Sequence, residues 1–388
     1  MDPGDHATGR DREARALLRE WLRARADPSR AMAIRAGIER GAWAWDDVRR
    51  LAEAERVAPL LHAAVGALGI VPADLAHVLH RARCATALRN RLLLNELGRC
   101  TDALAAAGVP VIVLKGAALA EAVYRDISLR PMVDVDVLIR QYTLESAARV
   151  LKRLGYVPIR KETHPGAVAE YENEIAFRKG GNFPVEIDVH WSLFDSPFHQ
   201  ARADMDWFWN TSVPLGIAGV ATRRLGSEAF LLHLCGHLAL HHAGAGLLWE
   251  HDVFELLATF GAATDWHMLL SKARAYDLVL PVRTVLRHSV EAWNAAVPPA
   301  ALAALCALPY SRREARVFAR IRRPDRSAGQ RFWADLMGIA DWRQRLRFTR
   351  TNLLPSAAYM RQRYRIPHSL LLALYYPYRW LRGLRGAR

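Results

Sequence analysis

The sequence predicts an α+β fold, in which a small mixed sheet with helices lies between helical regions at the two ends of the chain. Apolar residues recur with helical spacing from Asp11 to about Ala107, and again after Pro214. Between these regions, short apolar runs around 111–114, 133–139 and 185–191 have the pattern of strands. The chain has 388 residues, of which 52% are hydrophobic, so it is long enough to bury the cores of two or three domains.

Helix-ending and turn residues divide the chain. Gly108 and Pro110 end the N-terminal helical region at residues 1–108. In the α/β segment at 109–213, a strand runs into Lys115, a short helix follows, and a second strand begins near 134. The turn RKGGNFP predicts a hairpin between strands near 171–178 and 184–191. We predict a further helical domain at 214–342 and a basic, aromatic tail at 343–388.

Acidic residues alternate on two of the predicted strands. Asp134 and Asp136 share one face of the second strand, and Glu186, Asp188 and His190 share one face of the run VEIDVHW. Three carboxylates brought together in this way repel one another and raise each other's pKa unless a cation neutralises them. Oxygen ligands without a nearby cysteine favour Mg²⁺ or Mn²⁺. The alternative is that the first two aspartates form the exposed face of an edge strand.

The run LKGAALAEAVYRDISLRPMVDVDVLI resembles the uncharacterised nucleotidyltransferase family of the polymerase β-like superfamily. It has a Lys-Gly turn, a tyrosine, an Arg-Pro pair and an Asp-x-Asp strand in the family's order. Later landmarks, namely LGY at 154–156, EIDVHW, EAFLLHLCGHLALHH and LLWEHDVFELL, extend the resemblance over roughly Leu92 to Asp252. The resemblance implies a polymerase β-like nucleotidyltransferase palm at 109–213, beside a helical domain that closes over the nucleotide or receives the acceptor.

The resemblance also implies roles for the acidic residues. Asp134 and Asp136 match the two carboxylates that hold both metal ions, and Asp188 matches the third, which helps to deprotonate the acceptor. The implied reaction moves an NMP from an NTP to a hydroxyl, phosphate or similar group on a small molecule, peptide or protein, and releases pyrophosphate. The alternative is a catalytically inactive member of the fold that binds a nucleotide or a partner.

The turn before the first helix departs from the wider superfamily pattern. Gly116 matches the glycine of the phosphate-binding turn, but Ala117 follows it where a serine or glycine is usual. A hydroxyl that would contact a terminal phosphate is therefore missing, and Ala117 contributes only its backbone to nucleotide binding.

Two nearby cations can supply the lost charge. Lys115 and Arg130 lie near the strand ends and can bind phosphate oxygens. The alternative for Lys115 is a solvated cation at a strand end. The alternative for Arg130 is a salt bridge to Asp126 or Asp134.

Histidines recur on one predicted helix. His233, His237 and His241 are spaced every four residues and His242 is adjacent, which can indicate a metal site, a helix that lines the substrate cleft, or ordinary packing. No carboxylate lies in this stripe, so a metal site is not favoured. The residues that we predict to line a cleft are His190, His237, His241 and Asp252.

The net charge of +15 comes mostly from arginine. A basic protein attracts anions, and the predicted substrate, an NTP, is an anion. The sequence does not identify the acceptor.

Residues 343–388 hold eleven arginines among many aromatic residues, a composition typical of a helix lying on an anionic membrane. Pro377 should interrupt such a helix, so we favour a tail docked on the body. Nucleic acid is also considered as a partner and is not favoured.

The cysteines and the N-terminus indicate the compartment. Four widely spaced cysteines without a CxxC pattern predict reduced, buried thiols in a cytoplasmic protein. The polar N-terminus lacks the apolar core of a signal peptide, and no apolar run is long enough to span a membrane.

Overall fold

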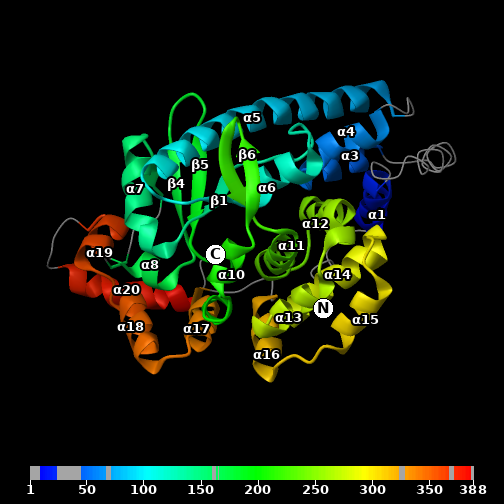
Figure 1. Cartoon of the computed structure of the whole chain (residues 1–388). Coiled ribbons are helices and arrows are strands. Elements are labelled where there is room, and N and C mark those ends of the chain that lie inside the picture. The colour runs from blue at the N-terminus through cyan, green and yellow to red at the C-terminus, as the bar shows by residue number, and fades with distance from the viewer. Residues whose placement is uncertain are drawn as a thin grey trace.

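The computed structural model describes residues 9–23, 45–66, 71–159, 163–164, 166–322, 328–366 and 371–385. Within them, one mixed seven-stranded sheet lies beneath a long helix, and further helices extend from it to both sides (Figure 1). This architecture confirms the predicted α+β fold.

The N-terminal helices support one edge of the structure. They are α1 (Gly9–Arg23), α3 (Trp45–Ala54), α4 (Ala58–Val65) and α5 (Ala73–Ala106). Helix α5 begins after Pro72 and crosses the top of the molecule in Figure 1, where it contacts β6, β7 and α7. Gly108, with a φ of +71°, lets the chain turn back from the end of α5 into the sheet.

The sheet has the order β3-β4-β5-β2-β1-β7-β6. Its strands are β1 (Ile112–Val113), β2 (Val135–Leu138), β3 (Val157–Pro158), β4 (Glu174–Lys179), β5 (Val185–His190), β6 (Val213–Ile217) and β7 (Val220–Arg224). β2 pairs with β5 and β1 pairs with β7 in parallel, and the other pairings are antiparallel. The β4–β5 hairpin forms at the turn that the sequence predicts, and it places β5 beside β2.

A second hairpin lies where the sequence predicts helix. β6 and β7 are joined by Ala218 and Gly219, both with positive φ, the conformation of a two-residue type I′ turn. β6 is the edge strand, which explains why Pro214 is tolerated in it. The sheet therefore extends to residue 224, beyond the expected boundary at 213.

Short helices connect the strands. They are α6 (Lys115–Leu119), the π-helical turn η2 (Ala120–Tyr124), η3 (Gln141–Thr143), α7 (Leu144–Arg153), α8 (Ala167–Tyr171), α9 (Pro197–Gln200) and α10 (Met205–Asn210). The large helical domain follows the sheet. It contains α11 (Ser227–Gly236), the π-helical turn η4 (His237–His241), α12 (Leu247–Phe260), η5 (Gly261–Ala263), α13 (Trp266–Ala275), α14 (Val279–Trp293), α15 (Pro299–Ala307) and α16 (Arg312–Ile321).

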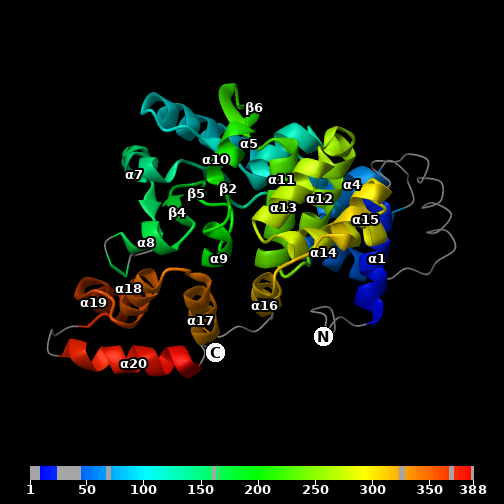
Figure 2. The ribbon, with the colours of Figure 1, turned by 60° about the horizontal axis from the view of Figure 1, so that its bottom comes forward.

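The last four helices form a C-terminal lobe, which lies apart from the helical domain in Figure 2. They are α17 (Ala328–Gly338), α18 (Trp342–Leu353), α19 (Ala357–Tyr364) and α20 (Leu372–Arg385). One continuous core joins the N-terminal helices, the sheet and the helical domain, whereas the lobe has a small core of Leu336, Ile339 and Phe348. Helix α20 continues through Pro377, contrary to the expected interruption.

The cysteines are only partly as expected. All four are free, but Cys84 and Cys306 are exposed, and only Cys100 and Cys235 are buried. The two exposed cysteines lie on outer faces of α5 and α15, because an apolar sequence neighbourhood does not fix which face of a helix is covered. No described helix combines the length and apolar character needed to cross a bilayer.

Candidate active site

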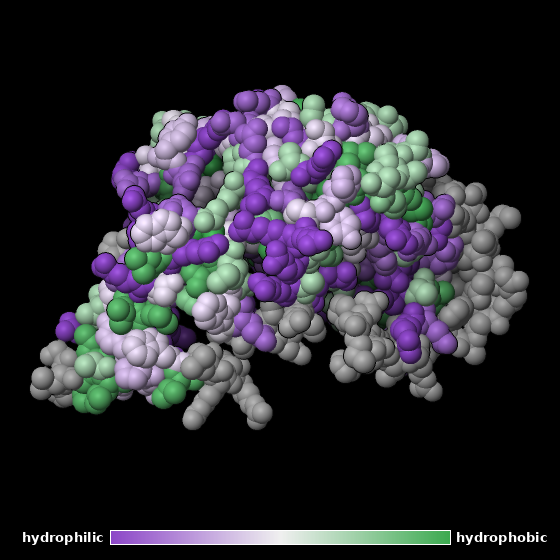
Figure 3. Space-filling model, turned by 90° about the horizontal axis from the view of Figure 1, so that it is seen from below, coloured by the Kyte–Doolittle hydropathy of each residue, from purple (hydrophilic) through white to green (hydrophobic). Residues whose placement is uncertain are grey.

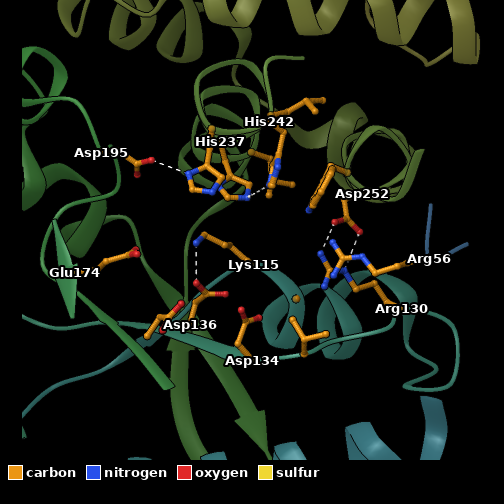
Figure 4. Close-up of a pocket in the computed structure, with 17 residues that line it drawn as sticks. Arg56, Lys115, Arg130, Asp134, Asp136, Glu174, Asp195, His237, His242 and Asp252 are labelled. Atoms are coloured by element: carbon orange, nitrogen blue, oxygen red, sulfur yellow. Dashed lines mark hydrogen bonds and ion pairs between the residues drawn. The ribbon is translucent and has the colours of Figure 1, made fainter. Parts of the chain in front are cut away.

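A cavity of about 280 Å³ lies between the sheet and the helices α11 and α12 (Figure 4). Strands β2 and β5 contribute its acidic side, and α6 contributes Lys115 and Gly116. The first turns of α12 and the end of α11 form the opposite side. The cavity thus collects residues from segments that are far apart in the sequence.

The three predicted aspartates line this cavity. Asp136 lies opposite Asp188 in the parallel pairing of β2 with β5, and Asp134 directly precedes β2. Alternation along β2 keeps its two aspartates on the same face. Burial of this face brings the three acids together in a largely enclosed space.

Two cations hold the central carboxylate in its ionised form. Lys115 Nζ donates to Oδ1 of Asp136 at 2.7 Å, and His190 Nε2 lies 2.9 Å from the same oxygen. Burial favours the neutral acid, but Lys115 and His190 outweigh it and hold the pKa of Asp136 well below its usual range. Burial and Lys115 oppose the charge on His190, but hydrogen bonding to Asp136 and to Glu174 raises the pKa of the imidazole to about 9.

Asp188 lacks such compensation. Burial, followed by repulsion from Asp136 and Glu174, raises the pKa of Asp188 to about 7. Its buried Oδ1 has no hydrogen-bond partner among the described residues. Burial and repulsion from Asp136 also raise the pKa of Asp134. A cation beside these two carboxylates would lower their electrostatic free energy.

The donor set suits a hard divalent cation. Asp134, Asp136 and Asp188 offer only oxygen, the ligand that Mg²⁺ and Mn²⁺ prefer. In the described part of the chain, no group of three or more His, Cys, Asp or Glu side chains stands in a ready arrangement for a metal ion. Figure 4 shows one reason, because Lys115 binds Asp136 from the cavity side. The three acids are therefore suited to bind a dication, and Lys115 competes with such a dication for Asp136.

Two further acids complete the site and were not predicted. Glu174 lies opposite His190 in the antiparallel pairing of β4 with β5, and its Oε2 is 2.9 Å from Nδ1 of the imidazole. Asp195 follows β5, and its Oδ2 is 2.7 Å from Nδ1 of His241. Extending the predicted hairpin register inward from its turn would have found Glu174. Nothing in the local sequence marks Asp195.

Arg130, in the loop before β2, connects this loop to the helical domain. Its Nη2 lies 2.8 Å from Oδ2 of Asp252 on α12, its Nε lies 3.3 Å from Oδ1, and both side chains are buried. The expected alternatives for Arg130, a salt bridge to Asp126 or to Asp134, are therefore wrong. Asp126 pairs with Arg83 instead. The sequence could not indicate this pairing, because the partners are 122 residues apart.

The turn at Gly116 is tightly packed. A Cβ atom there would lie 2.6 Å from Nη1 of Arg130 and 3.0 Å from Cγ of Met132, so only glycine fits without displacing the arginine. Lys115 has a φ of +40°, which costs a residue with a side chain about 1 kcal/mol. Ala117 is 1% exposed and its side chain does not reach the cavity wall.

Arg56 is a further cation that the sequence did not reveal. It comes from the turn between α3 and α4, and its guanidinium lies 5.0 Å from the centre of the Trp249 ring. Among the residues that the structure describes, no ion pair engages it. Figure 4 shows Arg56 beside the Arg130–Asp252 pair, at the end of the cavity away from the carboxylates.

The histidine stripe lines the cavity only in part. His237, His241 and His242 border it, whereas His233 is 1% exposed and lies outside the lining. Burial lowers the pKa of His237 well below its usual value, and burial followed by repulsion from His241 lowers that of His242 to about 3. The hydrogen bond to Asp195 raises the pKa of His241. The stripe thus contributes two neutral rings and one carboxylate-bound ring.

Asp188→Asn is expected to stabilise the protein more at pH 8 than at pH 5. The carboxyl has an ordinary pKa of 3.8 and a pKa of about 7 in the fold, so between these values the folded state binds more protons than the unfolded state. Its contribution to stability therefore falls as the pH rises through this window. Removing the charge should therefore raise the free energy of unfolding by on the order of 2 kcal/mol more at pH 8 than at pH 5.

Urea denaturation at both pH values, without divalent cations, measures this effect. The control is Asp102→Asn on the exposed face of α5, which should show no such pH-dependent gain. A variant at position 188 that is less stable than the wild type at pH 8 would contradict the expected electrostatic cost.

Asp252→Asn should destabilise the fold by about 3–5 kcal/mol, because it leaves Arg130 buried without its counter-charge. The double variant Arg130→Met/Asp252→Asn should recover part of this loss. Glu291→Gln, which breaks the exposed Arg287–Glu291 pair, is the control and should cost less than about 1 kcal/mol. Urea denaturation measures the free energy of unfolding of each variant. An equal loss of stability in Asp252→Asn and Glu291→Gln would show that the buried Arg130–Asp252 pair does not hold the sheet and the helical domain together.

Comparisons with known proteins agree with the sequence resemblance. A family model described as "Uncharacterised nucleotidyltransferase" matches residues 42–294, which include every residue of the cavity lining. A search of curated proteins gives no match. Among solved structures, an antigenic nucleotidyltransferase-like protein from Paracoccidioides brasiliensis matches with 15% identity and a TM-score of 0.37, over 56% of this chain and 97% of that chain. Because the family match spans more than half of its residues, the chain belongs to the uncharacterised nucleotidyltransferase family.

Proposed function

We propose that this protein is a nucleotidyltransferase that uses Mg²⁺ or Mn²⁺ to move a nucleoside monophosphate from an NTP to an acceptor. The observation that carries the proposal is the register of β2 and β5, which sets Asp136 opposite Asp188, with Asp134 in the same cavity. The buried, unpartnered oxygen of Asp188 supports the need for a cation.

The three aspartates are the residues that would hold divalent cations. Bound there, the cations would neutralise phosphate charge and favour loss of the acceptor proton. The acceptor oxygen attacks the α-phosphorus, the bond from the α-phosphorus to the oxygen bridging to the β-phosphorus breaks, and pyrophosphate leaves. Asp188 is the residue that would take up the acceptor proton.

Three cations of the cavity are suited to bind the triphosphate. Arg130 is held in place by Asp252, and Arg56 has no ion pair with a described residue. Lys115 neutralises Asp136 in the absence of ligand, and a dication on the carboxylates would free the ammonium for a phosphate. These charges take the place of the hydroxyl that is missing at Ala117.

A second, larger cavity supports a route for the acceptor. It has a volume of about 970 Å³ and adjoins the first, because Glu174, Asp195 and His241 line both. It lies between β4, which is next to the edge strand β3, and the C-terminal lobe, where Phe332 and Phe348 contribute aromatic surface. Its wall also carries arginines and carboxylates together. This mixed lining suits an acceptor on a small molecule, peptide or protein better than a polyanion.

The alternative is a catalytically inactive member of the fold that binds a nucleotide or a partner. It is favoured by Ala117 in the phosphate turn and by Lys115, which binds Asp136 where a metal would be held. This alternative predicts nucleotide binding without transfer.

The transfer test uses NTPs labelled at the α-phosphorus, Mg²⁺ or Mn²⁺, and cell extract as the source of acceptor. We expect label to enter an acceptor with the wild type, and Asp188→Asn and Asp136→Ala to reduce its incorporation at least about 100-fold. Asp188→Asn is the more informative variant, because it is expected to be at least as stable as the wild type. Asp102→Asn is the matched control and should retain full activity.

Other outcomes are equally specific. Incorporation from a γ-labelled NTP alone would indicate phosphoryl transfer and contradict the proposed reaction. Equal α-label incorporation by the wild type and Asp188→Asn would show that this carboxylate has no role in the transfer. Nucleotide binding without incorporation, with every NTP and both cations, would establish the inactive alternative.

A further inference from the structure

The charge of the protein is concentrated in its last helices. The net charge of the chain is +15, and the segment 342–388 contains eleven arginines, no lysine and no acidic residue. Arg343, Arg361, Arg363 and Arg382 are exposed, and none of them forms an ion pair with a described residue. The C-terminal lobe therefore presents strong positive charge that the rest of the protein does not neutralise.

The inner face of α20 is fixed to the lobe. Tyr376 Oη donates to the carbonyl of Pro355 at 2.8 Å, and Trp380 Nε1 donates to the carbonyl of Leu353 at 2.7 Å. Arg379 lies over the ring of Tyr359 on α19. These contacts set the rotation of the helix and thus decide which residues face outward.

The outer face of α20 is apolar. Leu374, Tyr378 and Leu381 are spaced by four and three residues, so they form one stripe, and they are 66%, 50% and 55% exposed. A buried helix would place such a stripe against a core. Here nothing in the described part of the chain covers it.

The neighbouring helices carry further exposed apolar side chains. Trp342 and Leu346 on α18 are 66% and 64% exposed, and Trp333 and Met337 on α17 are also exposed. Figure 3 shows green and pale side chains along the lobe, at the lower left of the view. Large exposed apolar side chains gathered on one lobe are typical of an interaction site.

We propose that the C-terminal lobe docks on an anionic membrane surface, with the stripe Leu374, Tyr378 and Leu381 in the headgroup region and the arginines on acidic lipids. Leucine and tyrosine in the stripe, with tryptophan elsewhere on the lobe, are residues typical of interfacial helices. Arginines near an anionic surface add an electrostatic attraction to the lipids. This inference does not depend on the transfer reaction.

The positive charge of the lobe distinguishes between the partners that could cover its apolar face. A second copy of the lobe would bring two segments of like charge together, which is unfavourable without anions between them. A nucleic acid would match the arginines but would leave the outward leucines in water. An anionic lipid surface satisfies both features at once.

The test is co-sedimentation of the full chain with vesicles of phosphatidylcholine containing 30% phosphatidylglycerol, and with vesicles of phosphatidylcholine alone. We expect binding to the anionic vesicles at least tenfold tighter than to the neutral ones. The stripe variant, Leu374→Ser/Tyr378→Ser/Leu381→Ser, should weaken it about tenfold or more. The matched control, Leu88→Ser/Leu92→Ser/Met268→Ser, removes three exposed apolar residues elsewhere and should bind like the wild type.

Circular dichroism and the thermal midpoint verify that both triple variants are folded. Absence of binding to anionic vesicles would overturn the proposal. Binding that the stripe variant retains in full would show adsorption by charge alone and would also overturn it. A concentration-dependent dimer that the stripe variant dissolves would assign the face to a second copy, and tight RNA binding without vesicle binding would assign it to nucleic acid.

Discussion

The structure depends on how negative charge is neutralised at the centre of its sheet. Pairing β2 with β5 places Asp136 opposite Asp188, and such proximity is unfavourable without nearby positive charge. Lys115 and His190 neutralise the first carboxylate but leave an oxygen of the second without a partner. The centre of the sheet thus carries negative charge that the protein does not fully neutralise, and the dication that we propose would neutralise it.

The helical domain supplies residues to the cavity as well as covering it. The buried Arg130–Asp252 pair fixes the loop before β2 to α12, and Tyr124 donates a further hydrogen bond to Asp252. The tyrosine ends the π-helical turn η2, and a second π-helical turn, η4, carries histidines into the cavity. Such turns shift side chains relative to a regular α-helix, and they are frequent at functional sites. Irregular helix geometry thus shapes both sides of the cavity.

The C-terminal lobe combines two surfaces with different chemistry. One surface contributes Phe332 and Phe348 to the large cavity that adjoins the carboxylates. The other presents the apolar stripe of α20 and the unneutralised arginines. If both proposals hold, the wall of the acceptor cavity belongs to the part of the protein that contacts the membrane. The small separate core of the lobe allows these surfaces to be built without disturbing the large core of the body.

Helical spacing towards both ends of the chain and short apolar runs between them predicted the α+β fold, because these patterns are local properties. Alternation along single strands predicted the face shared by Asp134 and Asp136 and the strand that carries Asp188. The partner of Arg130 and the rotation of α20 depend on contacts between distant segments. The β6–β7 hairpin escaped prediction because its turn needs two residues with positive φ, one of which is an alanine. The sequence alone determined which residues share a strand face, whereas only the tertiary structure decided which charges meet, since ion pairing follows distance in space.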